Sequence, residues 1–481
     1  MKKKTESIFE SSKGSKTLIG AIDPDVLAFT VGQDPVLDLR LVEWDCLGSA
    51  AHVTMLSRMA VKPVLFTKAD RDAVVAGLVD IMRASRAGEF RITEEDQDCH
   101  LAIERTLTEK LGALGKRVHT GRSRNDQSAT AIRLYARDAL LGTASEITDL
   151  AQALVAFGRR NRALPMVGRT HLQPAMPSSV GVWATAYAEE LLDTLDHVVW
   201  GAFDFTDRCP LGSAASYGVP LPIDRALTAR LLAFRAPIHN VLAAGNSRGK
   251  TESVVISALA QAMVTASRLA QDLILFSMPE FGYFSIPREF CTGSSIMPQK
   301  YNPDVCELIR SKAAQVVALA SAASGILVGM PGGYNRDLQD TKALLMEAFD
   351  TTRATLRILA RLVGGLQAHP DRLRAAFADP GVFATDRALE LVAGGMAFRD
   401  AYHEVRENLE DLRGMDPDET IAKKTHLGAP FGLDFGLYAK AVADARARVR
   451  AAERRIGAAV GKLLGVPYPA RGHRPPAHAK K

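Results

Sequence analysis

A heptad pattern of apolar residues constrains the fold of this chain more than any other feature. Its members recur at alternating spacings of four and three residues, and they are Val255, Leu259, Ala262, Ala266, Leu269, Leu273 and Phe276. This period places the apolar side chains on one stripe of an α-helix, and the alanines allow a neighbouring helix to approach closely. We therefore predict a long helix that packs lengthwise against others and ends before Pro279, because proline cannot continue a helix.

Other segments carry the same helical period. Residues near 123–160, 178–207, 302–325 and 338–365 are each expected to form a long helix. No convincing series of alternating apolar and polar residues indicates β-strands. Long helices with alanine-rich stripes favour an all-α fold built around an elongated long-helix bundle.

The same patterns divide the chain into five parts. The long helices define a central helical-bundle domain over residues 122–370. The flanking segments contain shorter helical patterns interrupted by proline and glycine, which predicts smaller helical domains over 18–121 and 371–470. The polar ends, 1–17 and 471–481, are expected to be disordered, and the second is basic.

The formal net charge of +6 originates at the two ends of the chain. Lys2, Lys3 and Lys4 contribute three positive charges and residues 471–481 contribute four, so the remainder lies close to −1. A folded basic face that could bind nucleic acid is therefore not indicated. No apolar run is long enough to span a membrane, and no apolar leader follows the basic start, so neither a membrane nor a secretory role is expected.

The cysteines indicate the redox environment. There are five, an odd number without paired spacing, and they are Cys46, Cys99, Cys209, Cys291 and Cys306. This usage favours free thiols in the cytoplasm over disulfides, and no cluster of ligands predicts a metal site.

The segment from Thr292 to Pro303, Thr-Gly-Ser-Ser-Ile-Met-Pro-Gln-Lys-Tyr-Asn-Pro, is the strongest indication of a binding site. It leads from a glycine into a predicted helix, for which Asn302 is a suitable N-cap and Pro303 a suitable first residue. Two adjacent hydroxyls, a lysine and the amides of a helix N-terminus can converge on one anion in such a loop.

This loop resembles the signature sequence of the fumarase/aspartase superfamily, whose members eliminate a group from a succinyl skeleton and release fumarate. Two further strings, His119–Gln127 (His-Thr-Gly-Arg-Ser-Arg-Asn-Asp-Gln) and Thr170–Gln173 (Thr-His-Leu-Gln), resemble motifs of its argininosuccinate lyase branch. Shorter agreements follow in the family's order, and they are Gly48–His52 after Asp45, Pro222–Arg225 and Tyr334–Gln339. The resemblance implies a mostly helical subunit, a homotetramer with active sites shared between subunits, and no metal or other cofactor.

The resemblance also implies β-elimination from an N-substituted aspartate, with argininosuccinate as the first choice of substrate. A base removes a proton beside a carboxylate, and the doubly charged intermediate needs fixed positive potential. Ser294 is the implied base, although a serine hydroxyl becomes basic only where local amides and a cation stabilise its alkoxide. Lys300 is the implied cation. His171 is implied as an acid or hydrogen-bonding organiser, and Glu307 is expected to hold its imidazole and raise its pKa.

The family's substrate-binding residues can be transferred to matching positions of this sequence. Ser123 is equally suited to cap a helix, and each of the others could alone be an ordinary polar residue. The expected set is Ser123, Arg124, Asn125, Thr170, Ser295, Asn302, Tyr334, Gln339 and Lys342.

Five positions depart from the family pattern, and several of them are near residues expected to bind the amine half of the substrate. Arg169 replaces the tyrosine of Gly-Tyr-Thr-His, while Met176 and Val182 stand where glutamine and histidine are expected. Gly249 ends a stretch that keeps only the arginine of Ser-Asp-Arg-Asp, and Asp34 occupies a serine position before Asp38.

Two alternatives therefore stay open. An enzyme of this branch could cleave a different aminosuccinate, for example of the ethylenediamine disuccinate type. A non-enzymatic role like that of lens crystallins is also compatible with the fold, although the presence of Ser294, His171, Lys300 and Glu307 favours an enzyme.

Overall fold

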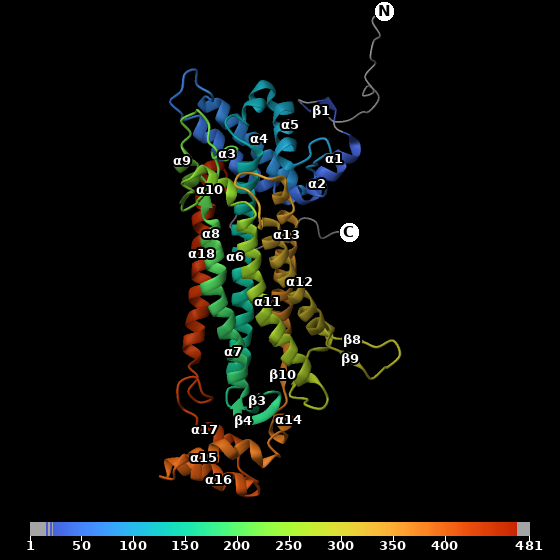
Figure 1. Cartoon of the computed structure of the whole chain (residues 1–481), viewed down its shortest axis with the longest axis vertical. Helices are drawn as coiled ribbons and strands as arrows, with labels where there is room; N and C mark the ends of the chain where they lie inside the picture. The colour runs from blue at the N-terminus through green and yellow to red at the C-terminus, as the bar shows by residue number, and fades with distance from the viewer. Residues whose placement is uncertain (1–15, 18–19, 22, 469–481) are drawn as a thin grey trace, which may run out of the picture.

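The protein is elongated and consists of three parts stacked along one axis (Figure 1). The computed structural model describes residues 16–17, 20–21 and 23–468, so the predicted tail 471–481 and most of the predicted tail 1–17 lie outside the described residues. A bundle of long helices occupies the middle, which confirms the predicted all-α class. Its helices are α6 (Arg124–Arg160), α7 (Val180–Asp193), α8 (Trp200–Thr206), α11 (Lys250–Ser277), α12 (Asp304–Leu327), α13 (Thr341–Gly365) and α18 (Phe435–Leu464). The predicted boundaries at 121 and 370 stay a prediction.

The axis of the bundle is α6, a single helix of 37 residues. Ser123 is its N-cap, and a capping box is completed by Asp126, whose carboxylate accepts a hydrogen bond from the Ser123 amide (3.0 Å). Helices α7, α13 and α18 pack against it, and most of its residues are buried. The predicted helix over 123–160 is thereby confirmed.

Helix α11 confirms the heptad prediction. Leu259, Leu269 and Leu273 are fully buried where α12 and α13 pack along it. By length and composition alone α11 could cross a membrane, but most of it is buried inside the bundle. The predicted helix over 178–207 is also present, with a π-helical stretch, η3 (Thr194–Val199), between α7 and α8.

The N-terminal end of the molecule caps the bundle where α6 begins (Figure 1). Helix α3 is buried along its whole length because it packs against both α4 and α6. The elements here are α1 (Pro24–Val31), α2 (Asp34–Leu37), η1 (Asp38–Arg40), α3 (Val42–Leu56), α4 (Lys68–Ala87), α5 (Cys99–Leu111) and η2 (Gly112–Arg117), joined by α9 (Arg225–Leu231) and α10 (Val241–Asn246) of the following region.

The opposite end is formed by short helices around a small second core that includes Phe377 and Phe383. They are α14 (Pro370–Ala375), η6 (Pro380–Phe383), α15 (Ala384–Ala393), α16 (Phe398–Glu407), η7 (Leu409–Leu412) and α17 (Pro417–Ala422). The expectation of short helices throughout the part after 370 is wrong for α18, which spans 30 residues and returns along α6. Its apolar stripe is narrow because polar residues surround Val442, Val449 and Val460, so the sequence pattern understated its length.

Short strand pairs, which the sequence did not predict, connect some of these helices. The hairpin of β3 (Pro165–Thr170) and β4 (Gln173–Ser179) follows α6. A second hairpin, β8 (Thr292–Gly293) with β9 (Tyr301–Asn302), precedes α12, and η5 (Arg336–Gln339) precedes α13. The other strands are β1 (Lys16–Thr17) with β2 (Gly20–Ala21), β5 (Arg208–Cys209) with β6 (Ala236–Pro237), and β7 (Phe284–Ser285), just before η4 (Arg288–Phe290), with β10 (Gln367–Ala368).

Candidate functional site

Polar side chains from several segments meet at the N-terminal end of α6. The Asn125 side chain is buried, and its Nδ2 donates to Ser216 Oγ (3.4 Å) while its Oδ1 has no protein partner among the described residues. Gly245 approaches so closely that a Cβ there would lie 2.0 Å from the Ser216 hydroxyl. Asn125 is thus held with a free amide oxygen, whereas Ser123 serves as the helix cap that its sequence context also suggested.

A buried arginine, Arg248, follows shortly after α10 in the chain. The guanidinium of Arg248 sits 5.1 Å from the ring centre of Tyr334, and its Nε has no hydrogen-bond partner in the described chain. Asn246 Oδ1 accepts from the Gly333 amide (2.7 Å), which fixes the turn that carries Tyr334. A buried guanidinium with a free donor is suited to bind a carboxylate.

Gly249, one of the departures from the family pattern, has a geometric explanation. Its φ is +75°, and a Cβ there would lie 2.6 Å from Leu327 Cδ2 and 2.7 Å from Leu338 Cδ2. A residue with a side chain would therefore be strained and would collide with both neighbours.

Lys342 and Gln339 are engaged within the subunit. Lys342 Nζ lies 2.8 Å from Asp34 Oδ1 and also contacts Asp38. Burial lowers the pKa of Lys342, but the carboxylates of Asp38 and Asp34 raise it by more, so it lies above its ordinary value. Gln339 Nε2 donates to the backbone oxygen of Thr30 (3.0 Å). Both predicted contact residues tie α1 and α2 to η5 and α13.

The loop from Gly212 to Gly218 is strained and faces the same end of α6. Ala214 and Ser216 both have positive φ, +52° and +77°. The amides of Gly212 and Ala214 donate to Asp126 Oδ2 at 2.9 and 3.0 Å. Burial raises the pKa of Asp126 to about 6, although these amides and Arg122 oppose the rise. The loop is thereby locked onto the start of α6.

Two residues of helix α3 hydrogen-bond to the predicted motif of residues 119–127. His52 Nε2 hydrogen-bonds to the Thr120 backbone oxygen (2.8 Å), and Arg122 Nη1 donates to Ser49 Oγ (2.9 Å). On the same helix Asp45 pairs with buried His100 (2.9 Å). Burial lowers the pKa of His100, but Asp45 raises it by more; burial raises the pKa of Asp45, but His100 lowers it by more.

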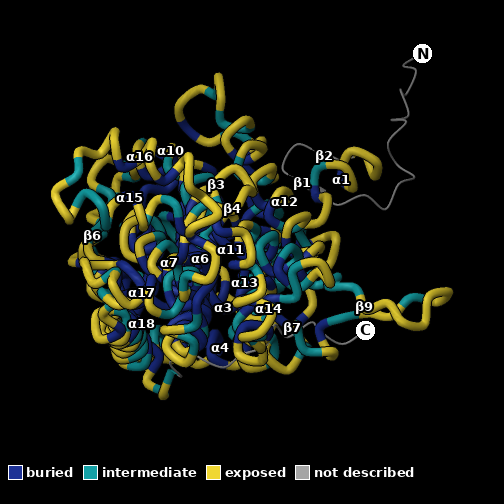
Figure 2. Tube along the Cα trace, turned by 90° about the horizontal axis from the view of Figure 1, so that it is seen from below, coloured by how far each residue is buried: buried dark blue, intermediate teal, exposed yellow. Residues whose placement is uncertain are grey.

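The signature segment forms the β8–β9 hairpin, which projects from the side of the bundle and is exposed (Figures 1 and 2). Ser294 Oγ accepts hydrogen bonds from the backbone amides of Met297 (3.1 Å) and Ile296 (3.4 Å). Two N–H donors aimed at one hydroxyl oxygen stabilise negative charge on it, as a serine base requires.

The predicted cap of the following helix is wrong by one residue. Helix α12 begins at Asp304 with Pro303 at the N-cap position, and Asn302 belongs to β9. The Asp304 carboxylate accepts a hydrogen bond from Thr292, which closes the base of the hairpin. Asn302 is therefore available to a ligand rather than used as a cap.

The remaining predicted residues of this segment face solvent. Ser295, Lys300 and Glu307 are exposed. The Arg288 guanidinium lies 4.7 Å from the ring centre of Tyr301 and steadies the hairpin. The base candidate and its implied cation thus sit on one projecting element.

His171 and Leu172 form the tip of the β3–β4 hairpin, where both have positive φ. Arg169 Nη1 donates to the Leu172 backbone oxygen (3.1 Å), so this departure supports the tip. Thr170 and His171 are exposed. In the described part of the chain no hydrogen bond joins the side chains of His171 and Glu307, so their pairing stays a prediction.

One subunit does not bring the predicted residues together. Asn125 and His171 lie at opposite ends of α6, which at 37 residues is about 55 Å long. Ser294 and Tyr334 lie at opposite ends of α12, whose 24 residues span about 36 Å. Figure 1 shows the three groups at the upper end, on the projecting hairpin and near the lower end.

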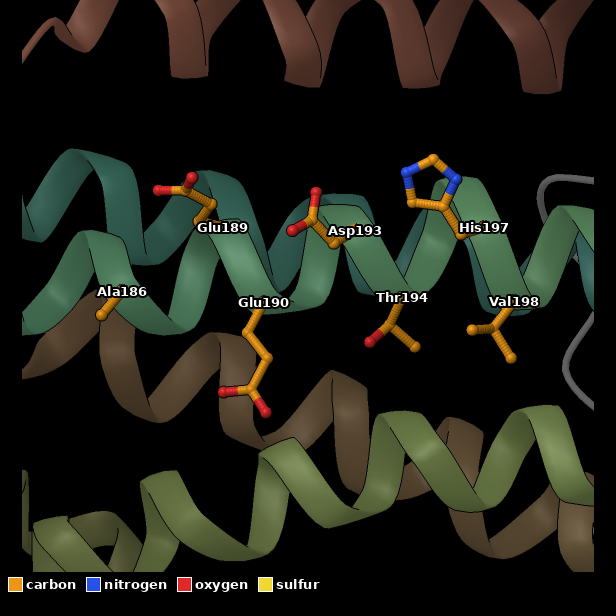
Figure 3. Close-up of a pocket in the computed structure, with 7 residues that line it drawn as sticks. All are labelled: Ala186, Glu189, Glu190, Asp193, Thr194, His197 and Val198. Atoms are coloured by element: carbon orange, nitrogen blue, oxygen red, sulfur yellow. The ribbon is translucent and has the colours of Figure 1, made fainter. Parts of the chain in front are cut away.

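A separate groove runs along α7 and η3 and has a volume of about 510 Å³ (Figure 3). Glu189, Glu190, Asp193 and His197 line it, and Arg268 pairs with Glu190 (3.0 Å). The negative charge of this lining would repel a dicarboxylate. None of the predicted site residues lines the groove. Among the described residues no group of three or more His, Cys, Asp or Glu side chains is placed to hold a metal ion.

The residues Asn125, Ser216, Asn246, Arg248 and Tyr334 are called the upper group below. Sequence reasoning assigned no role to several of them. Asn246 and Ser216 were missed, and Arg248 was noted only as a retained family residue. The sequence around these residues gives little indication of a site. Ser216, for example, has a positive φ, which is unusual for a serine and cannot be read from the sequence.

Comparison with known proteins agrees with the motifs. Residues 38–318 match the family model described as "Lyase". The chain is 46% identical over 414 residues to argininosuccinate lyase of Sorangium cellulosum, covering 86% of this chain and 95% of that protein. It is 38% identical over 386 residues to argininosuccinate lyase of Thermotoga neapolitana, covering 80% and 96%.

Solved structures share the fold at lower identity. EDDS lyase in complex with formate superimposes with a TM-score of 0.78 at 23% identity, covering 94% of this chain and 96% of that one. Class II fumarase from Schistosoma mansoni gives 0.68 at 18% identity, covering 84% and 98%.

Proposed function

Because this chain belongs to the lyase family of the fumarase/aspartase superfamily, we propose that it cleaves an N-substituted aspartate by β-elimination and releases fumarate. Argininosuccinate is the proposed substrate and arginine the second product. The proposal is supported by the identity to argininosuccinate lyases over most of the chain.

The observation that carries the proposed chemistry is the setting of Ser294. Its oxygen accepts two backbone amides, and Lys300 lies on the same hairpin. In the proposed reaction this oxygen takes the proton from the carbon next to the substrate carboxylate. Closure of the hairpin over substrate would exclude water and strengthen the stabilisation of the developing charge.

The upper group is proposed to bind the substrate carboxylates. Arg248 offers a buried Nε without a hydrogen-bond partner in the described chain, and Asn125 offers a buried amide oxygen likewise without one. As the negative charge grows during proton removal, such fixed positive potential stabilises the intermediate more than the ground state. Loss of the C–N bond then gives fumarate, and His171 is proposed to assist the departing nitrogen.

We further propose that the active unit is a homotetramer whose sites combine residues from different subunits. Helix α6, about 55 Å long, lies between Asn125 and His171, and α12, about 36 Å long, lies between Ser294 and Tyr334, so these residues can act together only if different subunits supply them. Helix α12 offers a face for it, because Leu308 and Val317 are exposed beside a stripe of small residues. That stripe, which would let another helix approach closely, comprises Ser311, Ala314, Ala318, Ser321, Ala322 and Gly325.

The direct test is fumarate release from argininosuccinate by purified protein, followed by ultraviolet absorbance. Turnover with stoichiometric arginine supports the proposed substrate. Turnover only with another aminosuccinate would keep the elimination and reassign the amine; no turnover with any aminosuccinate would refute the proposed activity. Light scattering after size-exclusion chromatography tests the tetramer, and a monomeric active enzyme would refute shared sites.

We propose a cytoplasmic location because all five cysteines are free thiols. Fractionation of cells that produce the protein tests it.

A further inference from the structure

The tip of the β3–β4 hairpin, which carries His171, is poorly stabilised by its own backbone. His171 and Leu172 form the two-residue turn, and their φ values of +53° and +62° are unfavourable for residues other than glycine. Two of the seven residues of β4, Pro174 and Pro177, have no amide hydrogen to donate to β3. The tip therefore depends on side chains for its position.

Arg169 supplies such support from the strand just before the tip. The register of the hairpin shifts between Gly168 and Arg169, and an irregularity of this kind bends a strand and redirects a side chain. Arg169 Nη1 donates to the Leu172 backbone oxygen (3.1 Å), and Nη2 donates to the Tyr283 hydroxyl (3.4 Å). The guanidinium also lies 4.9 Å from the ring centre of Phe281. Arg169 thus joins the tip to two aromatic residues that follow α11.

This aromatic pair is a rigid anchor, because it is fixed to the end of α11. Tyr283 is buried; its amide donates to the Phe276 backbone oxygen (2.9 Å), and its own backbone oxygen accepts from the His369 amide (2.9 Å). The Tyr283 ring stacks on Phe276 and meets Phe281 edge-on, with 5.4 Å between ring centres in both pairs. Through Arg169 the tip of the hairpin is therefore held against the helical bundle.

The base of the hairpin has a separate anchor in the short helices of the opposite end. Val167 is buried in the small second core, and its partner across the hairpin is Pro177. Lys424 Nζ donates to the Pro177 backbone oxygen (2.7 Å) and pairs with Asp386 (2.8 Å). These contacts lie on the base side of the register shift, so they fix the base and leave the tip to Arg169.

We propose that Arg169 is a positioning residue that holds the imidazole of His171 in place for the departing nitrogen. This inference rests on the proposed function and on the role of His171 in it. Arg169 acts through the backbone of the turn, so its loss should slow the reaction more than it weakens substrate binding. A tyrosine, which the family pattern has at this position, carries one donor and could make only one of the two hydrogen bonds.

The test compares kcat and KM for fumarate release from argininosuccinate in wild type, Arg169→Met and Arg169→Lys. Methionine keeps an unbranched apolar stem without donors, and lysine keeps the charge without the guanidinium fork that spans both partners. Arg169→Met is expected to lower kcat by about tenfold or more while KM changes by less than about twofold. Arg169→Lys should lie between it and wild type.

A second measurement reports on the tip without requiring activity. Hydrogen–deuterium exchange of the backbone amides of residues 170–173, followed by mass spectrometry, should be faster in Arg169→Met than in wild type. Tyr283→Phe removes one acceptor and should lower kcat less. Because both changes act on one contact, Tyr283→Phe should add little to the loss of kcat in Arg169→Met.

Arg448→Met is the matched control. The Arg448 guanidinium also lies on an aromatic ring, 4.1 Å from the ring centre of Trp200, but it contacts η3 at the far end of α7 from the hairpin. It should change neither kcat nor the exchange of residues 170–173.

The outcomes separate the positioning role from the proposed function. Unchanged kcat and exchange in Arg169→Met, or a loss confined to KM, would overturn the positioning role alone. If Arg169→Met does not fold, Arg169→Lys is compared with wild type by the same criteria. A wild type that releases no fumarate would overturn the proposed function, and faster exchange in Arg169→Met would then still support the contact between Arg169 and the tip.

Discussion

The ion-pair network that fastens α18 to α6 allows a sharp stability prediction. Asp207 accepts hydrogen bonds from Arg137 Nη1 (3.0 Å) on α6 and from Arg455 Nη2 (3.1 Å) on α18. Arg137 is 1% exposed and also donates to the backbone oxygens of Ala233 and Leu232. We predict that Asp207→Asn, which keeps the shape and removes the charge, strongly destabilises the protein.

The magnitude follows from the burial of Arg137. Burial lowers the pKa of Arg137 to about 10 even with Asp207 present, so its charged form is already disfavoured. Breaking a buried pair from one side typically costs about 3–5 kcal/mol. Because Arg137 keeps two carbonyl partners, we expect the lower end, about 3 kcal/mol.

Urea denaturation followed by circular dichroism, at equal subunit concentrations, measures the free energy of unfolding. Asp149→Asn is the control, since Asp149 pairs with Arg446 (2.8 Å) between the same two helices but at the surface. Exposed pairs contribute about 0–1 kcal/mol, so the control should change little. If Asp207→Asn were no more destabilising than Asp149→Asn, the account of the buried network would be refuted.

Four further outcomes are expected. Ser294→Ala should abolish fumarate release while elution as the same oligomer persists; full activity in that variant would remove Ser294 from the mechanism. His171→Asn should turn over slowly without loss of thermal stability, and near-normal rate constants would exclude a catalytic role for this exposed side chain. The buried pair of His100 and Asp45 should stabilise the fold most between about pH 4 and 6.5. The His100 contribution, from a raised pKa, is complete below its unfolded value and disappears as pH rises through the folded value, whereas the Asp45 contribution, from a lowered pKa, is lost as pH falls through its folded value. The difference in unfolding free energy between wild type and His100→Gln should therefore shrink toward alkaline pH, and a growing difference would contradict this. Ala214→Gly should raise stability by about 0.5–1 kcal/mol, because glycine relieves the strain of a positive φ more than it adds unfolded-state entropy; a lower melting temperature would show that the loop is not strained.

The sequence predicted features that depend on local pattern. The stripe from Val255 to Phe276 identified α11, and the Ser123 context identified the start of α6, because helical period and capping are properties of neighbouring residues. The predicted cap at Asn302 is wrong because this residue pairs in the β8–β9 hairpin, whose base is closed by the hydrogen bond between Thr292 and Asp304.

Features that depend on distant partners were less accessible. α18 was understated because its stability comes from α6 and from Asp207 rather than from its own apolar stripe. The motifs identified residues such as Lys342, but only the fold shows that this ammonium is buried between Asp34 and Asp38. Nor does the sequence alone reveal that Asn125 and His171 stand at opposite ends of one helix.

The crowded glycine at position 249 also limits the order in which this protein can evolve. Leu327 ends α12 and Leu338 lies in η5, so the two side chains that touch this glycine bracket the turn that carries Tyr334. A mutation that introduced a side chain at 249 would keep the strain of the positive φ, and it would also collide with both leucines unless they had first been replaced by smaller residues. Substitutions around this turn must therefore occur in a fixed order, with smaller residues at 327 and 338 preceding any side chain at 249.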